Sequence, residues 1–240
     1  MTDQSDTNKR IQLLEEIAAE VSAMSVDLGR ESLSPNVMAA IADVPRHQFV
    51  LLDDRDRAWE NTSLDIACGQ RISQPLTVAI MTEMLGVSLS DRVLEIGTGC
   101  GYQAAILSEL VADVYSVEVL DQLAQEAEIR LGRLGIDNVH VRHGDGLDGW
   151  AEAAPFDAII FTAALPEIPA RIFDQLKPGG RLVAPIGEVG PGIWDDLAGQ
   201  TLFLFEKDEE GHIERTPLLG VRFVPVIDAG RLRNLKRRLM

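Results

Sequence analysis

The strongest local signal for ligand binding is a glycine-rich run, Val93-Leu94-Glu95-Ile96-Gly97-Thr98-Gly99-Cys100-Gly101-Tyr102. Its apolar start predicts a buried strand, and its end predicts the beginning of a helix. Glycine is needed where the backbone must approach a ligand closely or take positive φ. In an open α/β sheet this loop would lie at the carboxyl end of a strand, where ligands bind. We therefore expect Glu95, Gly97, Thr98, Gly99 and Gly101 to form part of a ligand site.

Two further carboxylates come at or just after the ends of the next two predicted strands. Glu118 follows Val114–Val117, where it could accept hydrogen bonds from ribose hydroxyls. Asp145, with Gly146 after it, follows the third strand, where its carboxylate could meet an adenine amino group. Taken singly, Glu95 could be a loop acid and Asp145 a helix N-cap. Together, each at a strand end and in this order, the three acids favour a nucleoside ligand.

The spacing of this loop is E-x-G-x-G-x-G. The dinucleotide fingerprint is instead G-x-G-x-x-G, followed by an acidic residue about 20 positions later. With Glu118 and Asp145, the loop resembles the S-adenosylmethionine site of class I methyltransferases. The resemblance implies S-adenosyl-L-methionine as the cofactor, and binding of a dinucleotide is the alternative.

A second motif lies upstream, at Gly69-Gln70-Arg71-Ile72-Ser73-Gln74-Pro75. It resembles the active loop of protein-L-isoaspartate O-methyltransferases, G-Q-x-I-S-x-P, which is much more specific than the glycine loop. The resemblance extends over roughly Ile41 to Val226. Its other matches are Val44-Pro45-Arg46, Phe49-Val50, Gly97 to Gln103, Asp145-Gly146, Gly149-Trp150, Pro155-Phe156-Asp157, Thr162-Ala163-Ala164 with Pro166, Leu176 to Leu182, and Arg222-Phe223-Val224-Pro225.

The resemblance implies a role for several residues of these motifs. Ser73 is expected to contact the substrate carboxylate beside the methyl donor, and Ile72 and Thr162 to belong to the donor site. An isoaspartyl carboxylate has a pKa of about 4, so it is already a nucleophilic anion at neutral pH. Direct displacement at the sulfonium methyl needs alignment and no general base, metal or covalent intermediate. We therefore assign no catalytic role to the four histidines and expect no metal.

The chain departs from the family pattern at three places. Arg71 replaces a small hydroxyl residue, and it could either grip the substrate carboxylate or point to solvent. Ala67-Cys68 stands where the family usually has Gly-His, and Cys100 where it commonly has Ser. The two cysteines form no CxxC motif, which predicts a reducing compartment and no structural zinc. A disulfide between them is therefore not expected.

The elements that position these residues follow from hydrophobic periodicity. Residues 1–8 are expected to be a frayed tail, and the polar stretch 53–74 is long enough to suggest a functional loop. From residue 77 onward strands and helices alternate, which predicts an α/β fold with a doubly wound, mostly parallel sheet behind an N-terminal helical segment. Expected strands are 93–96, 114–117, 139–141, 158–161 and 182–184, with an antiparallel edge at 201–205 and 221–226. Expected helices are 11–21, 35–42, 77–85, 102–111, 120–134, 166–176 and 231–240.

These elements suggest three parts: residues 1–76 with the acceptor loop, a methyltransferase domain at 77–226, and a basic C-terminal helix at 227–240. The formal net charge of −16 disfavours nucleic acid and anionic membranes as partners. The first residues form no signal peptide, and no run of about 18 apolar residues occurs. We therefore expect a cytoplasmic enzyme, working as a monomer.

The function implied by the resemblance is methylation of L-isoaspartyl residues in damaged proteins and peptides, which starts their repair through a succinimide. One alternative is an aspartyl O-methyltransferase acting on a dedicated peptide during biosynthesis; the lack of a large extension after Val226 disfavours it. The other is a non-catalytic domain that binds S-adenosylmethionine, which the intact Ser73 and glycine loops disfavour.

Overall fold

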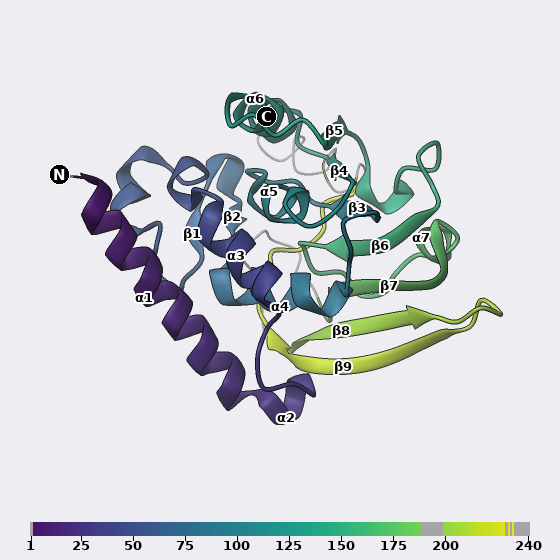
Figure 1. Cartoon of the computed structure of the whole chain (residues 1–240). Helices are drawn as coiled ribbons and strands as arrows, with labels where there is room; N and C mark the ends of the chain where they lie inside the picture. Colours follow the sequence, from purple (N-terminus) through teal and green to yellow (C-terminus); the bar gives the residue numbers. More distant parts are fainter. Residues whose placement is uncertain (1, 189–198, 229, 231, 233–240) are drawn as a thin grey trace.

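A seven-stranded sheet forms the centre of the computed structural model, which describes residues 2–188, 199–228, 230 and 232 (Figure 1). The strand order is β5-β4-β3-β6-β7-β8-β9, with β3 to β7 parallel and β8 and β9 antiparallel. The predicted doubly wound, mostly parallel α/β fold is confirmed. The strands are β3 Arg92–Ile96, β4 Asp113–Glu118, β5 Val139–His143, β6 Phe156–Phe161, β7 Leu176–Ile186, β8 Gln200–Lys207 and β9 Ile213–Val221.

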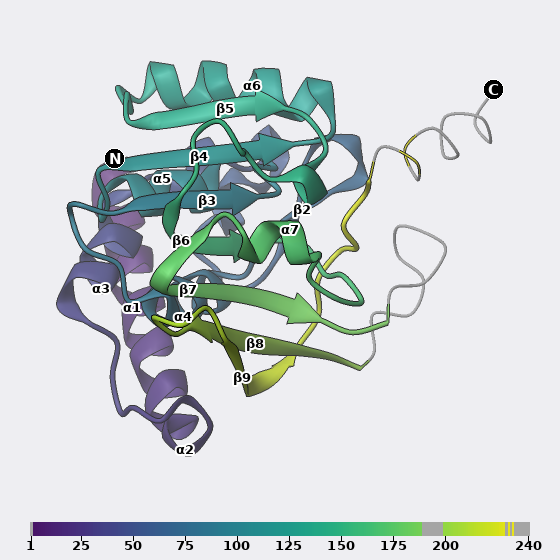
Figure 2. The same cartoon turned by 90° about the vertical axis from the view of Figure 1, so that its right-hand side faces the viewer.

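The sheet separates two apolar cores. Successive side chains of β6 alternate between them, so that Ala158 and Ile160 join one core and Ile159 and Phe161 the other. Near-continuous apolar strands are expected where a parallel sheet is covered on both faces. The larger core is covered by α1, α3, α4, α5 and α6, and the smaller by α7 (Figures 1 and 2). These helices are α1 Thr2–Ala23, α3 Pro35–Asp43, α4 Pro75–Leu85, α5 Tyr102–Ser108, α6 Asp121–Arg133 and α7 Ala170–Phe173.

The N-terminal helices show one success and one error of the sequence prediction. Helix α3 begins as expected, with Pro35 at its first position and the Ser34 hydroxyl accepting a hydrogen bond from the Val37 N–H at 3.4 Å. The frayed tail predicted for residues 1–8 is wrong, because α1 is helical from Thr2. Buried Leu13, Ile17 and Val21 hold α1 in the larger core. A four-residue helix, α2 (Ser25–Leu28), follows.

Two predicted elements lie elsewhere in the structure. The last strand is β9 at Ile213–Val221, whereas the sequence suggested 221–226. Residues 222–226 instead leave the sheet, making an isolated bridge between Pro225 and Ala164. The helix expected at 166–176 is reduced to α7, with Pro169 at its N-cap and β7 beginning at Leu176.

The long polar loop has its own secondary structure. Two 3₁₀ turns, η1 (Arg46–Gln48) and η2 (Leu52–Arg57), lead into it. Strand β1 (Leu64–Asp65) then pairs antiparallel with β2 (Arg71–Ile72) across a third 3₁₀ turn, η3 (Ala67–Gly69). This hairpin delivers the predicted acceptor loop to the sheet.

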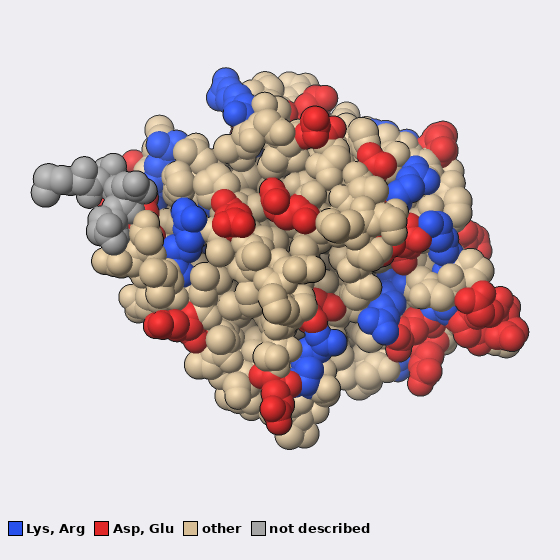
Figure 3. Space-filling view, in the orientation of Figure 1, with Lys and Arg blue, Asp and Glu red and all other residues tan. Residues whose placement is uncertain are grey.

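The surface carries both signs of charge. In the view of Figure 3 acidic side chains gather at the end of the β8–β9 hairpin, where Asp208, Glu209 and Glu210 are exposed. No helix in the described part of the chain is long and apolar enough to cross a membrane. The C-terminal helix predicted from residue 231 lies outside the described residues except for Leu232. The division of the chain at residues 76 and 226 stays a prediction.

Candidate active site

A deep pocket opens at the carboxyl ends of β3 and β4. The chain passes from β3 to β4 and β5 on one side and returns to β6 on the other, so this is the topological switch point of the sheet. Figure 2 shows the carboxyl ends of the parallel strands at one edge. The pocket is lined by residues 70–73, 96–100, 117–120, 162–163 and 224–227, with Val78, Tyr102, Gln103 and Gly146.

Residues 97–100 of the glycine loop line this pocket, and binding of a ligand by the loop stays a prediction. Gly97 has φ of 101°, and a β-carbon there would lie 2.4 Å from Oγ1 of Thr162. Only glycine fits that position. The Thr162 hydroxyl donates to the Gly97 carbonyl, which ties β6 to the loop. Gly97, Thr98, Gly99 and Thr162 line the pocket, whereas Gly101 is the N-cap of α5 and does not.

Glu118 lies at the tip of β4 and also lines the pocket. Its Oε2 accepts a hydrogen bond from the Gly99 N–H at 2.8 Å, and its Oε1 accepts one from the Leu120 N–H at 2.9 Å. Burial raises the pKa of Glu118, and these backbone donors oppose that rise. Each carboxylate oxygen can accept a further bond, so the group can still receive ligand hydroxyls.

Glu95 lies beneath the pocket and does not line it. The side chain is completely buried, and the Ser116 hydroxyl donates to its Oε2. The Ser116 and Thr98 hydroxyls are 2.5 Å apart, so a polar chain leads from Glu95 to a residue of the pocket wall. Burial raises the pKa of Glu95 to about 8, which favours the neutral carboxyl at pH 7. Glu95 is linked to the pocket through Ser116 and Thr98 in this arrangement, and its binding of a ligand stays a prediction.

Asp145 and Gly146 take different places after β5. Gly146 lines the pocket, and a β-carbon there would lie 2.5 Å from Cγ2 of Ile96. The Asp145 carboxylate accepts a hydrogen bond from the Leu147 N–H at 3.0 Å and caps the 3₁₀ turn η4 (Gly146–Asp148). Capping is the alternative that the sequence left open for this residue. Binding of a ligand by Asp145 stays a prediction.

The acceptor loop forms the other wall of the pocket. Ile72 is buried and Ser73 half-buried, and both line it. The exposed Arg71 side chain lies at the rim, where its Nη2 donates to the Ser63 carbonyl at 2.9 Å. Its Nη1 forms an ion pair with Asp65 at 3.1 Å. The hairpin itself therefore holds the guanidinium, and contact between Arg71 and substrate stays a prediction.

A wide groove adjoins the pocket on the side of the acceptor loop. Arg71, Ile72, Ser73, Thr162 and Val224 line both spaces. The groove continues between α1, α4 and the β8–β9 pair. Its other lining residues include Glu20, Met24, Thr77, Ile80, Thr201, Gly220 and Arg222. A polypeptide lying in the groove would pass Ser73 at the point where groove and pocket meet.

Sequence reasoning missed the segment that closes the pocket from the C-terminal side. Residues 224–227 line the pocket after the chain leaves β9. This segment is fixed by Gln200, whose buried amide accepts from the Phe223 N–H at 2.7 Å and donates to the Phe223 carbonyl at 3.1 Å. Its only sequence signal was the family match at Arg222-Phe223-Val224-Pro225, which was interpreted as a strand.

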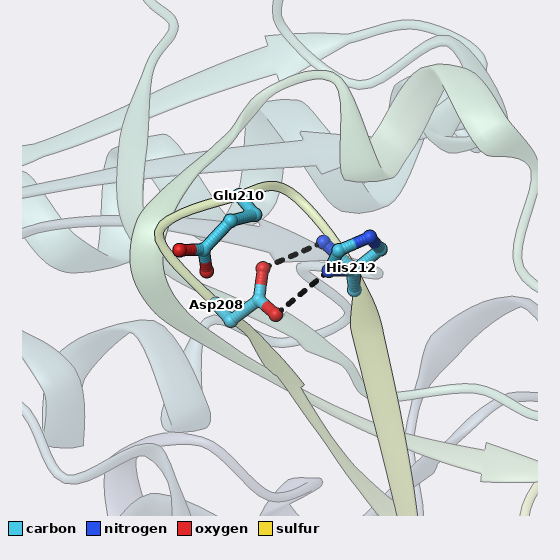
Figure 4. Close-up of side chains that lie close together, drawn as sticks. All are labelled: Asp208, Glu210 and His212. Atoms are coloured by element: carbon cyan, nitrogen blue, oxygen red, sulfur yellow. Dashed lines mark hydrogen bonds and ion pairs between the residues drawn. The ribbon is translucent and has the colours of Figure 1, made fainter.

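Other chemically active residues lie apart from the pocket. Among the described residues, Asp208, Glu210 and His212 bring their ligand atoms within 4.8 Å of one another, all exposed at the β8–β9 turn (Figure 4). The register of β7 and β8 puts this turn at the opposite edge of the sheet from the pocket. None of the four histidines lines the pocket or the groove. Both cysteines are free, with Cys68 exposed and Cys100 in the pocket wall.

The residues of the pocket suit a nucleoside ligand. Glu118 offers acceptors for hydroxyls, and Val117, Val119 and Leu120 provide apolar surface for a base. Gly97 and Gly99 let the backbone come close. With the sheet order described above, this site defines an S-adenosylmethionine-dependent methyltransferase of class I.

Comparison with known proteins identifies the family. The sequence model of the protein-L-isoaspartate(D-aspartate) O-methyltransferase (PCMT) family matches residues 20–231, so the chain belongs to that family. A protein-L-isoaspartate O-methyltransferase 2 of Syntrophobacter fumaroxidans is 49% identical over 217 residues, covering 90% of this chain and 85% of that protein. A solved protein-L-isoaspartate O-methyltransferase is 30% identical with a TM-score of 0.74, covering 96% of this chain and 70% of that one. A Plasmodium falciparum structure in complex with S-adenosyl-L-homocysteine has the same fold (TM-score 0.72, 22% identity, covering 90% of this chain and 97% of that one).

Proposed function

We propose that this enzyme transfers the methyl group of S-adenosyl-L-methionine to the free carboxylate of L-isoaspartyl residues in damaged proteins and peptides. The observation that carries the proposal is the position of Ser73, which lines both the deep pocket and the wide groove. The pocket suits the methyl donor and the groove suits a polypeptide. We call them the donor pocket and the acceptor groove from here on.

A few residues of the donor pocket are assigned to binding of the methyl donor. We infer that Glu118 accepts hydrogen bonds from the ribose hydroxyls and that Gly97, Gly99 and Gly146 admit the ligand close to the backbone. Glu95 supports Thr98 through Ser116 from beneath. When bound, S-adenosylmethionine supplies a methyl group activated by the positive charge on its sulfur.

The chain needs only to orient the acceptor. The substrate carboxylate is ionised at neutral pH, since its pKa is about 4. One of its oxygens forms a bond to the methyl carbon while the carbon–sulfur bond breaks, which gives a methyl ester and a neutral thioether. The Ser73 hydroxyl hydrogen-bonds the carboxylate and fixes its direction of approach. The backbone nitrogen of the next substrate residue then attacks the ester carbonyl and gives up its proton, and methanol leaves, which closes a succinimide. Water opens this ring partly to normal aspartate.

Selectivity for the isomerised linkage tests the proposal. In an isoaspartyl residue the free carboxylate is on the α-carbon, beside the main chain, whereas in aspartate it is one methylene away on another branch. A misplacement of about 1 Å can lower a rate by around 10²-fold. We expect labelled donor to methylate an isoaspartyl peptide at least about 10²-fold faster than its aspartyl twin. Equal labelling of both peptides, or labelling of neither, would contradict the proposal and favour modification of a dedicated peptide.

The binding partners, cellular compartment and oligomeric state of the enzyme are inferred from its charge, its cysteines and the lining of its pocket and groove. We infer that isoaspartyl proteins and peptides are its partners and that nucleic acids and membranes are not, because the net charge is −16. The free cysteines support a reducing compartment such as the cytoplasm. We infer that it acts as a monomer, since the pocket and the groove are built from one chain.

A further inference from the structure

Arg46 is a buried cation at the base of the acceptor loop. It lies in the 3₁₀ turn η1, directly after α3, and its side chain has no exposed surface. Its Nη1 donates to the Ala58 carbonyl at 2.6 Å. Its Nη2 donates to the Thr62 carbonyl at 2.9 Å and to the Ser73 carbonyl at 3.0 Å. In the part of the chain that the structure describes, no carboxylate forms an ion pair with Arg46.

Two of the three carbonyls lie near the beginning of one loop, at Ala58 and Thr62, and the third lies at its end, at Ser73. Residues 58–73 follow η2, form the β1–β2 hairpin, and lead into α4. The last of the three carbonyls belongs to Ser73, the residue expected to orient the substrate. Arg46 therefore hydrogen-bonds to both ends of this loop, and one of these bonds goes to the backbone of Ser73 itself.

The same guanidinium also packs against a residue of the donor pocket wall. It lies 5.7 Å from the centre of the Tyr102 ring. Tyr102 is the first residue of α5, follows the glycine loop directly, and lines the donor pocket. Arg46 thus contacts the element that carries the donor loop as well as the loop that carries Ser73.

Burial of the Arg46 guanidinium costs free energy of desolvation, which its bonds to the three carbonyls offset. A buried charge is unfavourable when it is not compensated, and an apolar side chain could fill the same space. Arginine stays charged when buried and presents its N–H groups in a rigid planar fork. Such a fork can hold three carbonyls at fixed relative positions, which neither an apolar residue nor the single ammonium nitrogen of lysine reproduces.

We propose that Arg46 is a positioning residue for methyl transfer: it fixes the acceptor loop against α5, so that Ser73 meets the substrate carboxylate at the mouth of the donor pocket. The inference rests on the proposed function, because it takes Ser73 to be the residue that orients the substrate. It predicts that losing the fork harms the chemical step more than donor binding.

The test compares Arg46→Lys and Arg46→Met with the wild type. With an isoaspartyl peptide, kcat should fall by about 10²-fold in both variants, the effect of roughly 1 Å of misplacement. The Kd for S-adenosylhomocysteine should change by less than about threefold, because the hydrogen bonds of Arg46 go to Ala58, Thr62 and Ser73 and not to Gly97, Gly99 or Glu118, the residues assigned to donor binding. Amide hydrogen exchange should quicken over residues 58–74 and stay unchanged over 93–102.

A control variant separates positioning from stability. Ile172→Ala removes a buried side chain of α7 from the smaller core, on the other face of the sheet. It should lower the melting temperature and leave kcat and exchange over 58–74 unchanged. An unchanged kcat in the Arg46 variants, or parallel loss of kcat and of S-adenosylhomocysteine binding, would overturn the proposal. If the wild type labels no isoaspartyl peptide, the proposed function fails, while the exchange measurement still decides whether Arg46 holds the loop.

Discussion

The buried carboxyl of Glu95 should make the stability of the protein depend on pH. The side chain is fully buried beneath the glycine loop, and burial raises its pKa from the usual 4.5 to about 8. In the unfolded chain the same group titrates near its usual value. The folded state therefore binds this proton more tightly. The stability that it contributes is fully present below about pH 4.5 and is lost as the pH rises toward 8.

The size of the effect follows from the difference between the two pKa values. Each pKa unit corresponds to about 1.4 kcal/mol. Between pH 5 and pH 8 the group should lower the free energy of unfolding by about 3 to 4 kcal/mol. Domains are commonly stable by about 5 to 15 kcal/mol, so this loss is a large share of the total.

Glu95→Gln isolates the contribution of Glu95 ionisation to the free energy of unfolding. Glutamine does not titrate, and the other charges of the protein are the same in both chains. We expect urea unfolding at pH 5, 6, 7 and 8 to show the wild type losing stability relative to the variant as the pH rises. Ser116→Ala is the control: it removes the hydrogen bond to Glu95 but keeps the titrating group, so its pH dependence should persist. A difference between wild type and Glu95→Gln that is constant over this range would refute the buried, neutral carboxyl.

Three further predictions concern ligand binding and catalysis. Gly99→Val should abolish binding of S-adenosylhomocysteine in calorimetry, because φ there is 55° and a β-branched side chain is strained at positive φ; Gly132→Ala, in α6 with open space around it, should bind normally. Ser73→Ala should lower kcat by roughly 10²–10³-fold with little change in donor affinity, and loss of donor binding alone would show that Ser73 binds the methyl donor and does not orient the acceptor. The rate should be flat from about pH 6 to 7.5 and fall as the acceptor protonates near 4. An inflection near pH 7 that disappears in His47→Gln would show that a histidine takes part.

The accuracy of the sequence prediction depended on how local each signal was. The parallel strands were predictable because a strand covered on both faces is apolar throughout. Strand β9 was misplaced because it is an edge strand, and exposed Glu214, Arg215 and Thr216 conceal its pairing with β8. The apolar residues 221–226 look more like a strand, yet they serve as a wall of the donor pocket.

The candidate site shows the same limit. The glycine loop and Ser73 could be proposed from motifs, because each motif is a short run of consecutive residues that can be recognised in the sequence. The role of Arg46 could not, since its three carbonyl partners lie 12, 16 and 27 residues away in the chain. Likewise, the capping hydrogen bond of Asp145 depends on where its own turn closes, which spacing alone did not decide.

The segment at 224–227 has a consequence for how the protein is made. It forms one wall of the donor pocket, and the acceptor loop at 70–73 forms another, about 150 residues earlier in the chain. A ribosome adds roughly 5 to 20 residues per second. The acceptor loop is therefore synthesised several seconds before the segment at 224–227. A growing chain therefore has the glycine loop and Glu118 but no closed pocket. The enzyme should acquire its affinity for the methyl donor only after residues 200–227 have been synthesised, when Gln200 can dock Phe223 and the second wall comes into place.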